Sequence, residues 1–185
     1  MIFVELIYTL VGEINQENVS QAILWINGRI AEGNHNPIKF YLSSTGGDID
    51  SAIRLYDFLK AIPNQVQTIG FAQVDSAAVL IFLAGEKRTA IKRCRFRIHE
   101  STYTAHRNVG SLPHHVDMLR FFEELDRRTK DIVACETNKP IDEVRALYQK
   151  GKIMSAEEAK DYGIVHTITH TLPVPPKPDL QKATS

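Results

Sequence analysis

The chain contains few of the features that mark specialised classes of protein. Only two cysteines, Cys94 and Cys135, occur in 185 residues, and they lie far apart in the sequence. This excludes a disulfide framework and a zinc site built from paired cysteines, and it is typical of a reduced, cytoplasmic protein. The seven histidines form no convincing ligand set, so we expect no metal ion and no cofactor.

Net charge and long apolar runs are absent as well. Lysine plus arginine and aspartate plus glutamate number 22 each, which gives a formal net charge of zero. This balance argues against nucleic acid or an anionic membrane as the main partner. We interpret the basic stretch 87–97 as a solvated strand edge or hairpin rather than a polyanion site. No apolar run reaches the ~20 residues of a membrane-spanning helix, and the alternating residues 1–14 indicate a strand, not a signal peptide.

What the chain does contain is an alternation of strands and helices that is typical of an α/β protein. Strands are predicted at residues 2–11, 38–43, 66–71, 88–92, 95–99 and 164–169. Helices are predicted at 19–30, 49–59, 77–84, 113–136 and 141–149, with a further one that begins at a Ser155–Glu158 capping box and ends at Gly163. Residues 100–112 look irregular. We expect one domain over residues 1–170 and an extended, proline-rich tail over 171–185.

The stretch "GFAQVDSAAVLIFLAG" (70–85) places a serine between a strand and an almost wholly apolar helix. Free N–H groups and the positive end of the helix dipole favour negative charge at such a position. Ser76 is therefore a candidate nucleophile, and the small Ala77 would let a substrate carbonyl approach the backbone. A helix-capping or plain buried serine is the alternative, and it is the usual one for an isolated motif of this kind.

Two further motifs could complete the chemistry that a serine nucleophile needs. His99 ends the predicted strand "RFRIH", from which its ring can project into a cleft as a general base. The turn "SSTGGD" (43–48) carries the paired glycines Gly46 and Gly47, which expose backbone N–H groups and allow close approach of a substrate. A structural histidine and a simple tight turn are the alternatives.

The order of these motifs resembles that of the proteolytic subunit of the Clp protease, within the Clp/crotonase superfamily. "YLSSTGGDI" looks like the family's "YINSPGG", and "DSAAVLIFLAG" looks like "SMGAFLLAAG". "RIHES" is similar to "MIHQP", and "IMSAEEAKDYGIVHTI" (153–168) is similar to "FMSAEEAxxYGLID". The resemblance covers residues 7–168. It implies a Clp protease/crotonase-like fold, a repeated β-β-α spiral with a protruding handle helix.

The resemblance also implies a role for each matching residue. Ser76 would be the nucleophile and His99 the base, and the backbone N–H groups of Gly47 and Ala77 would form the oxyanion hole, with Gly46 allowing the turn. Residues 100–136 would be the handle, which in that family interlocks two seven-membered rings into a closed chamber. The apolar face of the predicted long helix, which consists of Val116, Leu119, Phe122 and Leu125, agrees with such an assembly.

Three departures from the family pattern stand out. Gly151 occupies the position of the family's triad aspartate, so the carboxylate that orients the histidine is missing where it is expected. Asp75, beside the serine, is expected to cap the helix, and Glu100 to point away from His99. The chain starts close to the first core strand, so the N-terminal axial loops that engage the ATPase ring are not expected. Thr45 replaces the turn proline, and the segment before Ser76 is two residues longer.

These motifs predict a serine endopeptidase that cleaves peptides or unfolded proteins inside a ring-shaped homo-oligomer, with an ATPase unfoldase as a doubtful partner. A second interpretation is a pseudo-protease, a Clp-like structural subunit with little activity, which the glycine at position 151 favours and the retained serine and histidine disfavour. A third is a crotonase-type enzyme that acts on acyl thioesters. That class would require a longer chain and active-site glutamates, which the sequence lacks.

Overall fold

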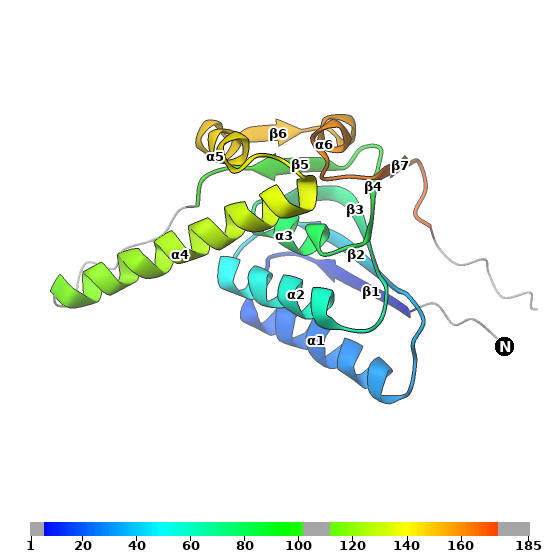
Figure 1. Ribbon diagram of the computed structural model, residues 1–185. Coiled ribbons are helices and arrows are strands. Elements are labelled where there is room, and N and C mark those ends of the chain that lie inside the picture. Colours follow the sequence, from blue (N-terminus) through cyan, green and yellow to red (C-terminus); the bar gives the residue numbers. More distant parts are fainter. Residues whose placement is uncertain (1–5, 102–111, 174–185) are drawn as a thin grey trace, which may run out of the picture.

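The computed structural model describes residues 6–101 and 112–173, and it consists of a mostly parallel sheet with helices on its faces (Figure 1). The strands are β1 (Leu6–Val11), β2 (Ile38–Ser44), β3 (Val66–Asp75), β4 (Lys87–Ile91), β5 (Arg95–Ile98), β6 (Lys152–Met154) and β7 (Thr167–Thr169). The helices are α1 (Gln16–Ala31), α2 (Ile49–Ala61), α3 (Ala77–Leu83), α4 (Leu112–Thr137), α5 (Ile141–Lys150) and α6 (Ala156–Tyr162). The alternation of strands and helices confirms the predicted α/β class.

Several helices begin where the sequence places a capping side chain. Asn15 accepts a hydrogen bond from the N–H of Asn18 at 2.9 Å, and α1 follows it. Ser155 and Glu158 form the predicted capping box at α6, in which each side chain accepts from the other residue's backbone N–H. Such caps satisfy N–H groups that have no partner within the helix. These two helix starts are therefore fixed by local chemistry.

Strand β3 organises the sheet because it pairs with different strands along its length. Its first half lies between β2 and β4, and its second half pairs with β5. Between the pairs Leu42–Gly70 and Ser44–Val74, β3 uses four residue steps where β2 uses two. Ala72, at φ 55°, lies at this bulge. The bulge gives β3 two more residues than β2 shortly before Ser76, so the pairing beyond it continues in a register shifted by two.

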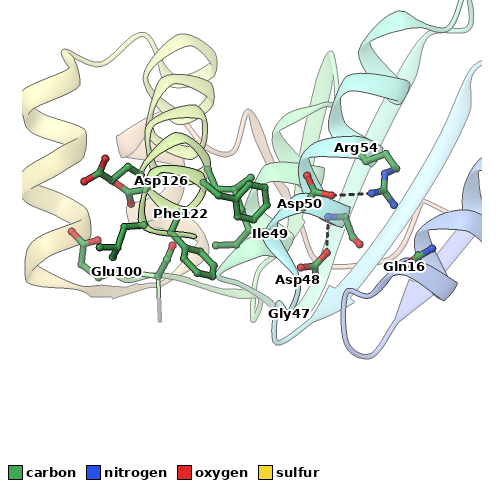
Figure 2. A pocket seen from close by; sticks show the side chains of 15 residues that line it. Gln16, Gly47, Asp48, Ile49, Asp50, Arg54, Glu100, Phe122 and Asp126 are labelled. Atoms are coloured by element: carbon green, nitrogen blue, oxygen red, sulfur yellow. Dashed lines mark hydrogen bonds and ion pairs between the residues drawn. The ribbon is translucent and has the colours of Figure 1, made fainter. Parts of the chain in front are cut away.

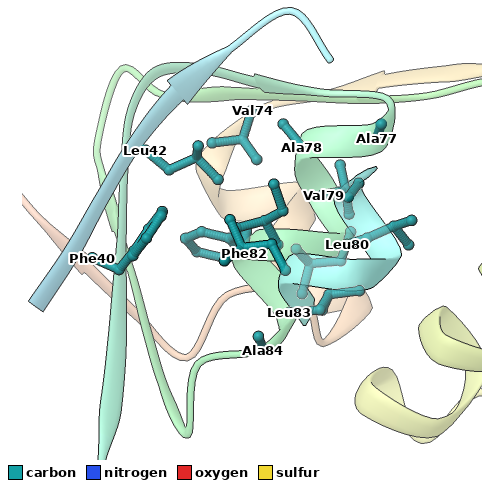
Figure 3. Packing of buried hydrophobic residues seen from close by; sticks show 14 of the residues in the cluster. Phe40, Leu42, Val74, Ala77, Ala78, Val79, Leu80, Phe82, Leu83 and Ala84 are labelled. Atoms are coloured by element: carbon teal, nitrogen blue, oxygen red, sulfur yellow. The ribbon is translucent and has the colours of Figure 1, made fainter. Parts of the chain in front are cut away.

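The core of the molecule is built around α3, whose seven residues are all buried. Figure 3 shows this helix packed against side chains of β2 and β3, among them Phe40, Leu42 and Val74. The ring of Phe82 meets that of Phe96 on β5 at 5.2 Å between centroids. Full burial of each large apolar side chain is worth about 1.5–3 kcal/mol. The strong packing of α3 therefore holds its N-terminal end, and the residue before it, in a fixed place.

Helix α4 lies partly on the body and partly beyond it, and its N-terminal end protrudes (Figure 1). Leu125 and Val133 are buried, whereas Val116 and Leu119 are exposed. The predicted apolar face of α4 therefore has two parts. Leu125 belongs to the core and Phe122 packs against the core, whereas Val116 and Leu119 remain exposed in the monomer.

The structure also corrects some expected boundaries. Strand β3 continues to Asp75 instead of ending at residue 71, and β6 was not predicted, although it pairs antiparallel with β5. The last strand is shorter than expected because Ile164 and Val165 lie buried in the turn before it. The predicted irregular segment after residue 101, the first residues of the chain and most of the predicted tail lie outside the described residues.

Candidate active site

Ser76 occupies a strained turn between β3 and α3. Its backbone angles are φ 56° and ψ −126°, a conformation that residues with a side chain rarely adopt. The strain costs about 1–3 kcal/mol and persists only where the surroundings impose it. Here the Ser76 N–H donates to the carbonyl of Arg97 at 2.7 Å, which ties the turn to β5. Such a strained strand-to-helix turn is known to present a nucleophilic serine in other hydrolases.

The Ser76 hydroxyl does not cap α3. The helix starts after Ser76, yet no hydrogen bond joins its side chain to the helix N–H groups. The carbonyl of Ser76 does accept the N–H of Val79 at 3.0 Å, so only the backbone takes part in the helix start. The capping alternative for this serine is therefore wrong, and its half-buried side chain remains available for another role.

Asp75 has a different role from the one expected. Its carboxylate Oδ2 accepts from Arg95 Nη2 at 2.8 Å, and Oδ1 is buried without a partner among the described residues. The prediction that Asp75 caps α3 is wrong, because the side chain turns toward β5 instead. Since Asp75 is paired with Arg97 in the β3–β5 ladder, the ion pair reinforces the strand junction immediately before Ser76.

Gly46 and Gly47 bring the β2–α2 turn against this serine. A Cβ on Gly46, at φ 95°, would lie 2.7 Å from the Cβ of Ser76 and 3.1 Å from the backbone N of Ala77. A Cβ on Gly47, at φ 145°, would overlap the carbonyl oxygen of Ile14. Both positions thus require glycine, one for the approach to Ser76 and one for the bridge that Gly47 forms with Ile14.

Two backbone N–H groups near Ser76 remain free in the described part of the chain. The N–H of Gly46 donates to Ser44 Oγ at 3.0 Å, and that of Asp48 donates to Ile14 at 2.8 Å. No such bond involves the N–H of Gly47 or that of Ala77. Unpaired donors of this kind are what an oxyanion requires.

His99 follows β5 and lines one small cavity together with Ser76 and Ala77. Its Nδ1 lies 2.8 Å from the carbonyl oxygen of Glu100. A carbonyl oxygen can only accept, so Nδ1 carries the proton and Nε2 of the neutral ring is the free acceptor. Ser76 and His99 both belong to the described part of the chain, and no hydrogen bond joins the Ser76 hydroxyl to the His99 ring. In ligand-free enzymes such contacts are often longer than in the complex with substrate.

Gly151 lies next to His99, as its match to the family's aspartate would require. A Cβ on Gly151 would be 3.9 Å from the Cβ of His99. The residue has φ 64° and ψ 135°, a conformation that favours glycine, and its N–H ends helix α5. The neighbouring Lys152 pairs with Glu158 at 3.2 Å. Position 151 is therefore close to His99, but its glycine has no carboxylate that could accept a hydrogen bond from the ring.

Glu100 supplies its backbone, not its carboxylate, to His99. The Glu100 side chain lies 3.5 Å from Lys130 Nζ. Asp75 is held by Arg95, as described above. Neither candidate for a third catalytic acid therefore has its carboxylate on the histidine ring in this structure.

A cleft of about 630 Å³ begins at Gly47 and extends between the start of α2 and the middle of α4 (Figure 2). Ile49 and Phe122 form part of its apolar lining. Acidic residues, including Glu100 and Asp126, lie along the same walls. Its volume is in the range of pockets that bind small ligands or short peptide segments.

Among the residues of the small cavity that the sequence did not indicate are Thr129 on α4 and Tyr148 on α5. Neither stands in a motif, because helices distant in sequence bring them there.

Burial, with a smaller effect of the Asp75 charge, raises the pKa of the Cys94 thiol to about 12, so this cysteine is no nucleophile at neutral pH.

The described residues offer neither a group of metal ligands nor a helix that could span a membrane. Residues 6–101 and 112–173 contain no cluster of three or more histidine, cysteine, aspartate or glutamate side chains that could hold a metal ion. Over the same ranges, no helix combines the length and apolar character needed to cross a bilayer.

Comparison with known proteins agrees with the motifs. The family model for Clp protease matches residues 1–171. The ATP-dependent Clp protease proteolytic subunit 3 of Rhizobium johnstonii is 31% identical over 160 residues, which is 85% of this chain and 80% of that protein. Subunit 3 of Rhizobium etli is 30% identical over 159 residues, again 85% and 80% of the two chains. Subunit 2 of Corynebacterium jeikeium is 33% identical over 137 residues, 71% of this chain and 63% of that protein. With its mostly parallel sheet and protruding helix, this chain belongs to the Clp protease family.

Proposed function

We propose that this protein is a serine endopeptidase in which Ser76 is the nucleophile and His99 the general base. The observation that carries the proposal is the strained backbone at Ser76. The side chain of this serine caps no helix, and Ser76 lines one cavity together with His99. Strain at a residue that makes no structural hydrogen bond with its side chain is characteristic of functional sites. Membership in the Clp protease family supports the same reaction class.

In this mechanism the Ser76 hydroxyl attacks a peptide carbonyl and passes its proton to Nε2 of His99. The developing oxyanion receives hydrogen bonds from the free N–H groups of Gly47 and Ala77. The histidine then donates the proton to the leaving amine, and water releases the acyl group from Ser76 by the reverse sequence. Gly46 contributes by leaving space, because any larger residue would press on Ser76.

The backbone carbonyl of Glu100 replaces one of the two functions of the missing aspartate, which are to orient the histidine and to stabilise its charged form. It holds the proton on Nδ1 of His99 and so fixes the tautomer that can act as a base. As a neutral acceptor it stabilises the imidazolium less than a carboxylate would. Loss of the aspartate lowers the rate of a serine protease by about 10⁴. We therefore expect slow turnover, with peptides and activated esters as the best substrates.

A pseudo-protease is the second candidate, and Gly151 is the observation that favours it. The residue lies beside His99 without a carboxylate, in a backbone conformation that disfavours replacing it. In that case the chain would serve as a structural subunit, alone or together with an active paralogue.

We further propose that the protein acts in the cytoplasm as a ring-shaped homo-oligomer on peptides or unfolded proteins. The exposed apolar residues of α4, Val116, Leu119 and Phe121, support assembly. The relatives are named as subunits of an ATP-dependent protease. We therefore include an ATPase unfoldase among the proposed partners of this chain. Nucleic acid and membranes are not among the partners we propose.

Covalent labelling tests the proposal directly. Treatment with a fluorophosphonate, followed by intact-mass measurement, should give one adduct per chain that is absent from Ser76→Ala. Ser101→Ala is the matched control, because Ser101 lines the same cavity and its loss should leave labelling intact. An adduct that survives in Ser76→Ala would refute the nucleophile. No adduct on the wild-type chain would favour the pseudo-protease.

A further inference from the structure

The backbone carbonyl of Glu100, which accepts the hydrogen bond from His99, lies in a segment that the sheet does not hold. The carbonyl oxygen is 2.8 Å from Nδ1 of the His99 ring. Glu100 and Ser101 come after the end of β5, and neither forms a backbone–backbone hydrogen bond within residues 6–101 and 112–173. The place of this carbonyl therefore depends on contacts of the side chains around it.

The side chain of Glu100 is attached to a buried cation on α4. Both of its carboxylate oxygens lie 3.5 Å from Nζ of Lys130. Lys130 is 9% exposed, and salt and water screen a pair with a buried partner much less than a pair on the open surface. This contact joins the segment after β5 to a helix that begins further along the chain.

Lys130 is itself fixed by two further contacts. Its Nζ donates to Oδ2 of Asp126, one helical turn earlier, at 2.7 Å. The same Nζ lies 5.5 Å from the centre of the Tyr148 ring on α5. Figure 2 shows the carboxylates of Glu100 and Asp126 on the same side of the large cleft. A buried ammonium requires partners of this kind, because burying it unpaired is very costly. Its position is therefore well defined.

We infer that Lys130 is a positioning residue that acts on His99 through Glu100. The ammonium holds the Glu100 side chain, this fixes the Glu100 carbonyl, and the carbonyl keeps the proton of the neutral ring on Nδ1. The inference rests on the proposed function, in which the bare Nε2 takes the proton of Ser76. Lys130 thus supplies from α4 the orientation of the ring that an aspartate at position 151 would otherwise supply.

Loss of Lys130 should change the protonation pattern of the ring. The Glu100 peptide would then be free to turn, and a neutral imidazole without a fixed acceptor can carry its proton on either nitrogen. Rings protonated at Nε2 cannot act as the base. The side chains of Glu100 and Asp126 are partly exposed, so Lys130→Met leaves them in contact with water and should still fold.

Magic-angle-spinning NMR of protein labelled with ¹⁵N at histidine tests this directly, because it distinguishes the protonated from the bare ring nitrogen. The signals of His99 are those absent from His99→Gln. At pH 8, where an ordinary histidine is neutral, the wild-type ring should carry its proton on Nδ1 alone. In Lys130→Met a second form, protonated at Nε2, should appear. Unchanged His99 signals in Lys130→Met overturn the inference.

Labelling kinetics with an uncharged fluorophosphonate measure the consequence for Ser76. In Lys130→Met the maximal labelling rate should fall by about tenfold, within the ~10² that a misplaced reacting group can cost. The half-saturating probe concentration should stay the same, because Lys130 lines neither the small cavity nor the cleft. A raised half-saturating concentration with an unchanged maximal rate overturns the positioning role.

Glu100→Gln shows whether Lys130 acts through Glu100. It keeps the backbone carbonyl but loses the ion pair, so it should have the same effects as Lys130→Met. The double variant should be no slower than either single one, since both remove the same contact. Additive losses, or a Glu100→Gln variant that behaves like the wild type, overturn the inference.

Lys139→Met is the matched control. Lys139 also pairs with a carboxylate, that of Glu143 at 3.3 Å, and also lies over an aromatic ring, that of Tyr162 at 5.1 Å. Its loss should alter neither the His99 signals nor the labelling rate. Failure of the proposed function has a different signature: the wild-type chain gives no adduct, or the adduct survives in Ser76→Ala. The NMR comparison still decides the inference in that case, because it needs no activity.

Discussion

The backbone at Ser76 shows how this fold imposes an unfavourable conformation on a single residue. Three features act on the turn: the hydrogen bond from its N–H to Arg97, the buried Asp75 held by Arg95, and the anchored helix α3. Together they offset a conformational cost of about 1–3 kcal/mol. These contacts therefore hold Ser76 in its strained conformation.

Gly46 offers a test of this arrangement at the residue scale. Gly46→Ala would place a Cβ 2.7 Å from that of Ser76 and 2.8 Å from the carbonyl oxygen of Asp75, at φ 95°. We expect urea denaturation to show a loss of about 1–3 kcal/mol. Fluorophosphonate labelling should slow by more than about tenfold, because an activation free energy raised by about 1.4 kcal/mol lowers a rate tenfold.

A glycine elsewhere in the chain provides the control for that variant. Gly28 lies inside α1 with open space around its Cα. Gly28→Ala should stabilise the protein by up to about 1 kcal/mol and leave labelling unchanged. If Gly46→Ala reacts as fast as the wild type, the turn at Gly46 does not position the serine.

Gly151 allows the missing carboxylate to be put back. Gly151→Asp should cost about 1–3 kcal/mol of stability, because the backbone there has φ 64° and ψ 135°. It should nevertheless raise esterase or peptidase kcat/KM by about tenfold, a part of the ~10⁴ that an aspartate contributes in serine proteases.

Gly151→Asn separates charge from shape in this experiment. It bears the same backbone cost and a side chain of nearly the same size, but no negative charge. We expect it to be destabilised without any gain in rate. An equal gain in both variants would mean that the carboxylate is not what His99 lacks.

At the scale of elements, helix α4 is fixed to the body by one partly buried network. The carboxylate of Glu136 accepts from Tyr56 at 2.6 Å, from Lys60 at 2.9 Å and from Arg88 at 3.2 Å. Arg88 also donates to the backbone carbonyl of Glu136 at 2.9 Å and to that of Gly163 at 3.0 Å. The network thus joins α2, β4 and the end of α6 to the C-terminal end of α4.

Removing the Glu136 charge should loosen this junction in a pH-dependent way. Burial acts to raise the pKa of Glu136, but the hydrogen bonds from Tyr56 and Lys60 and the charge of Arg88 outweigh it, so the pKa lies below its ordinary value. The stabilisation is present above a glutamate's unfolded pKa of about 4.3 and is lost as pH falls through the folded value. Glu136→Gln should therefore cost about 3 kcal/mol at pH 7, and much less at pH 3.

Denaturation at several pH values would measure this difference, and Glu124→Gln is its control on the same helix. Glu124 pairs with Arg127 on the surface, where water and salt screen an ion pair and leave it little net effect on stability. Its loss should change stability little at any pH. A Glu136→Gln variant as stable as the wild type at pH 7 would show that the network does not anchor α4.

At the scale of the whole molecule, we expect the protruding part of α4 to contact other copies of the chain. Val116, Leu119 and Phe121 are 38%, 49% and 53% exposed, an unusual concentration of apolar surface for a monomer. Light scattering at micromolar concentration should give a mass several times the 20.9 kDa of one chain. Leu119→Asp combined with Phe121→Asp should lower that mass, whereas Arg120→Ala, between them, should not. A monomeric wild-type protein would refute the ring assembly.

The sequence by itself determined most of the elements, though not β6 or the full length of β3, and it determined the small set of candidate residues. Capping residues such as Asn15 and Ser155, the glycine pair after β2 and the apolar run of α3 act through neighbours within a few positions. Their patterns therefore specify local structure before any long-range contact forms. The same local order was enough to identify the family and to single out Ser76 and His99.

Only the tertiary structure decided what surrounds that serine. The positive φ of Ser76, the bulge in β3 and the proximity of Gly151 to His99 each depend on segments that fold against one another. Thr129 reaches the cavity because α4 packs beside α3, although 53 positions, 129 minus 76, separate it from Ser76. Local periodicity carries no information about such distances, because they are set by the packing of buried side chains between distant elements.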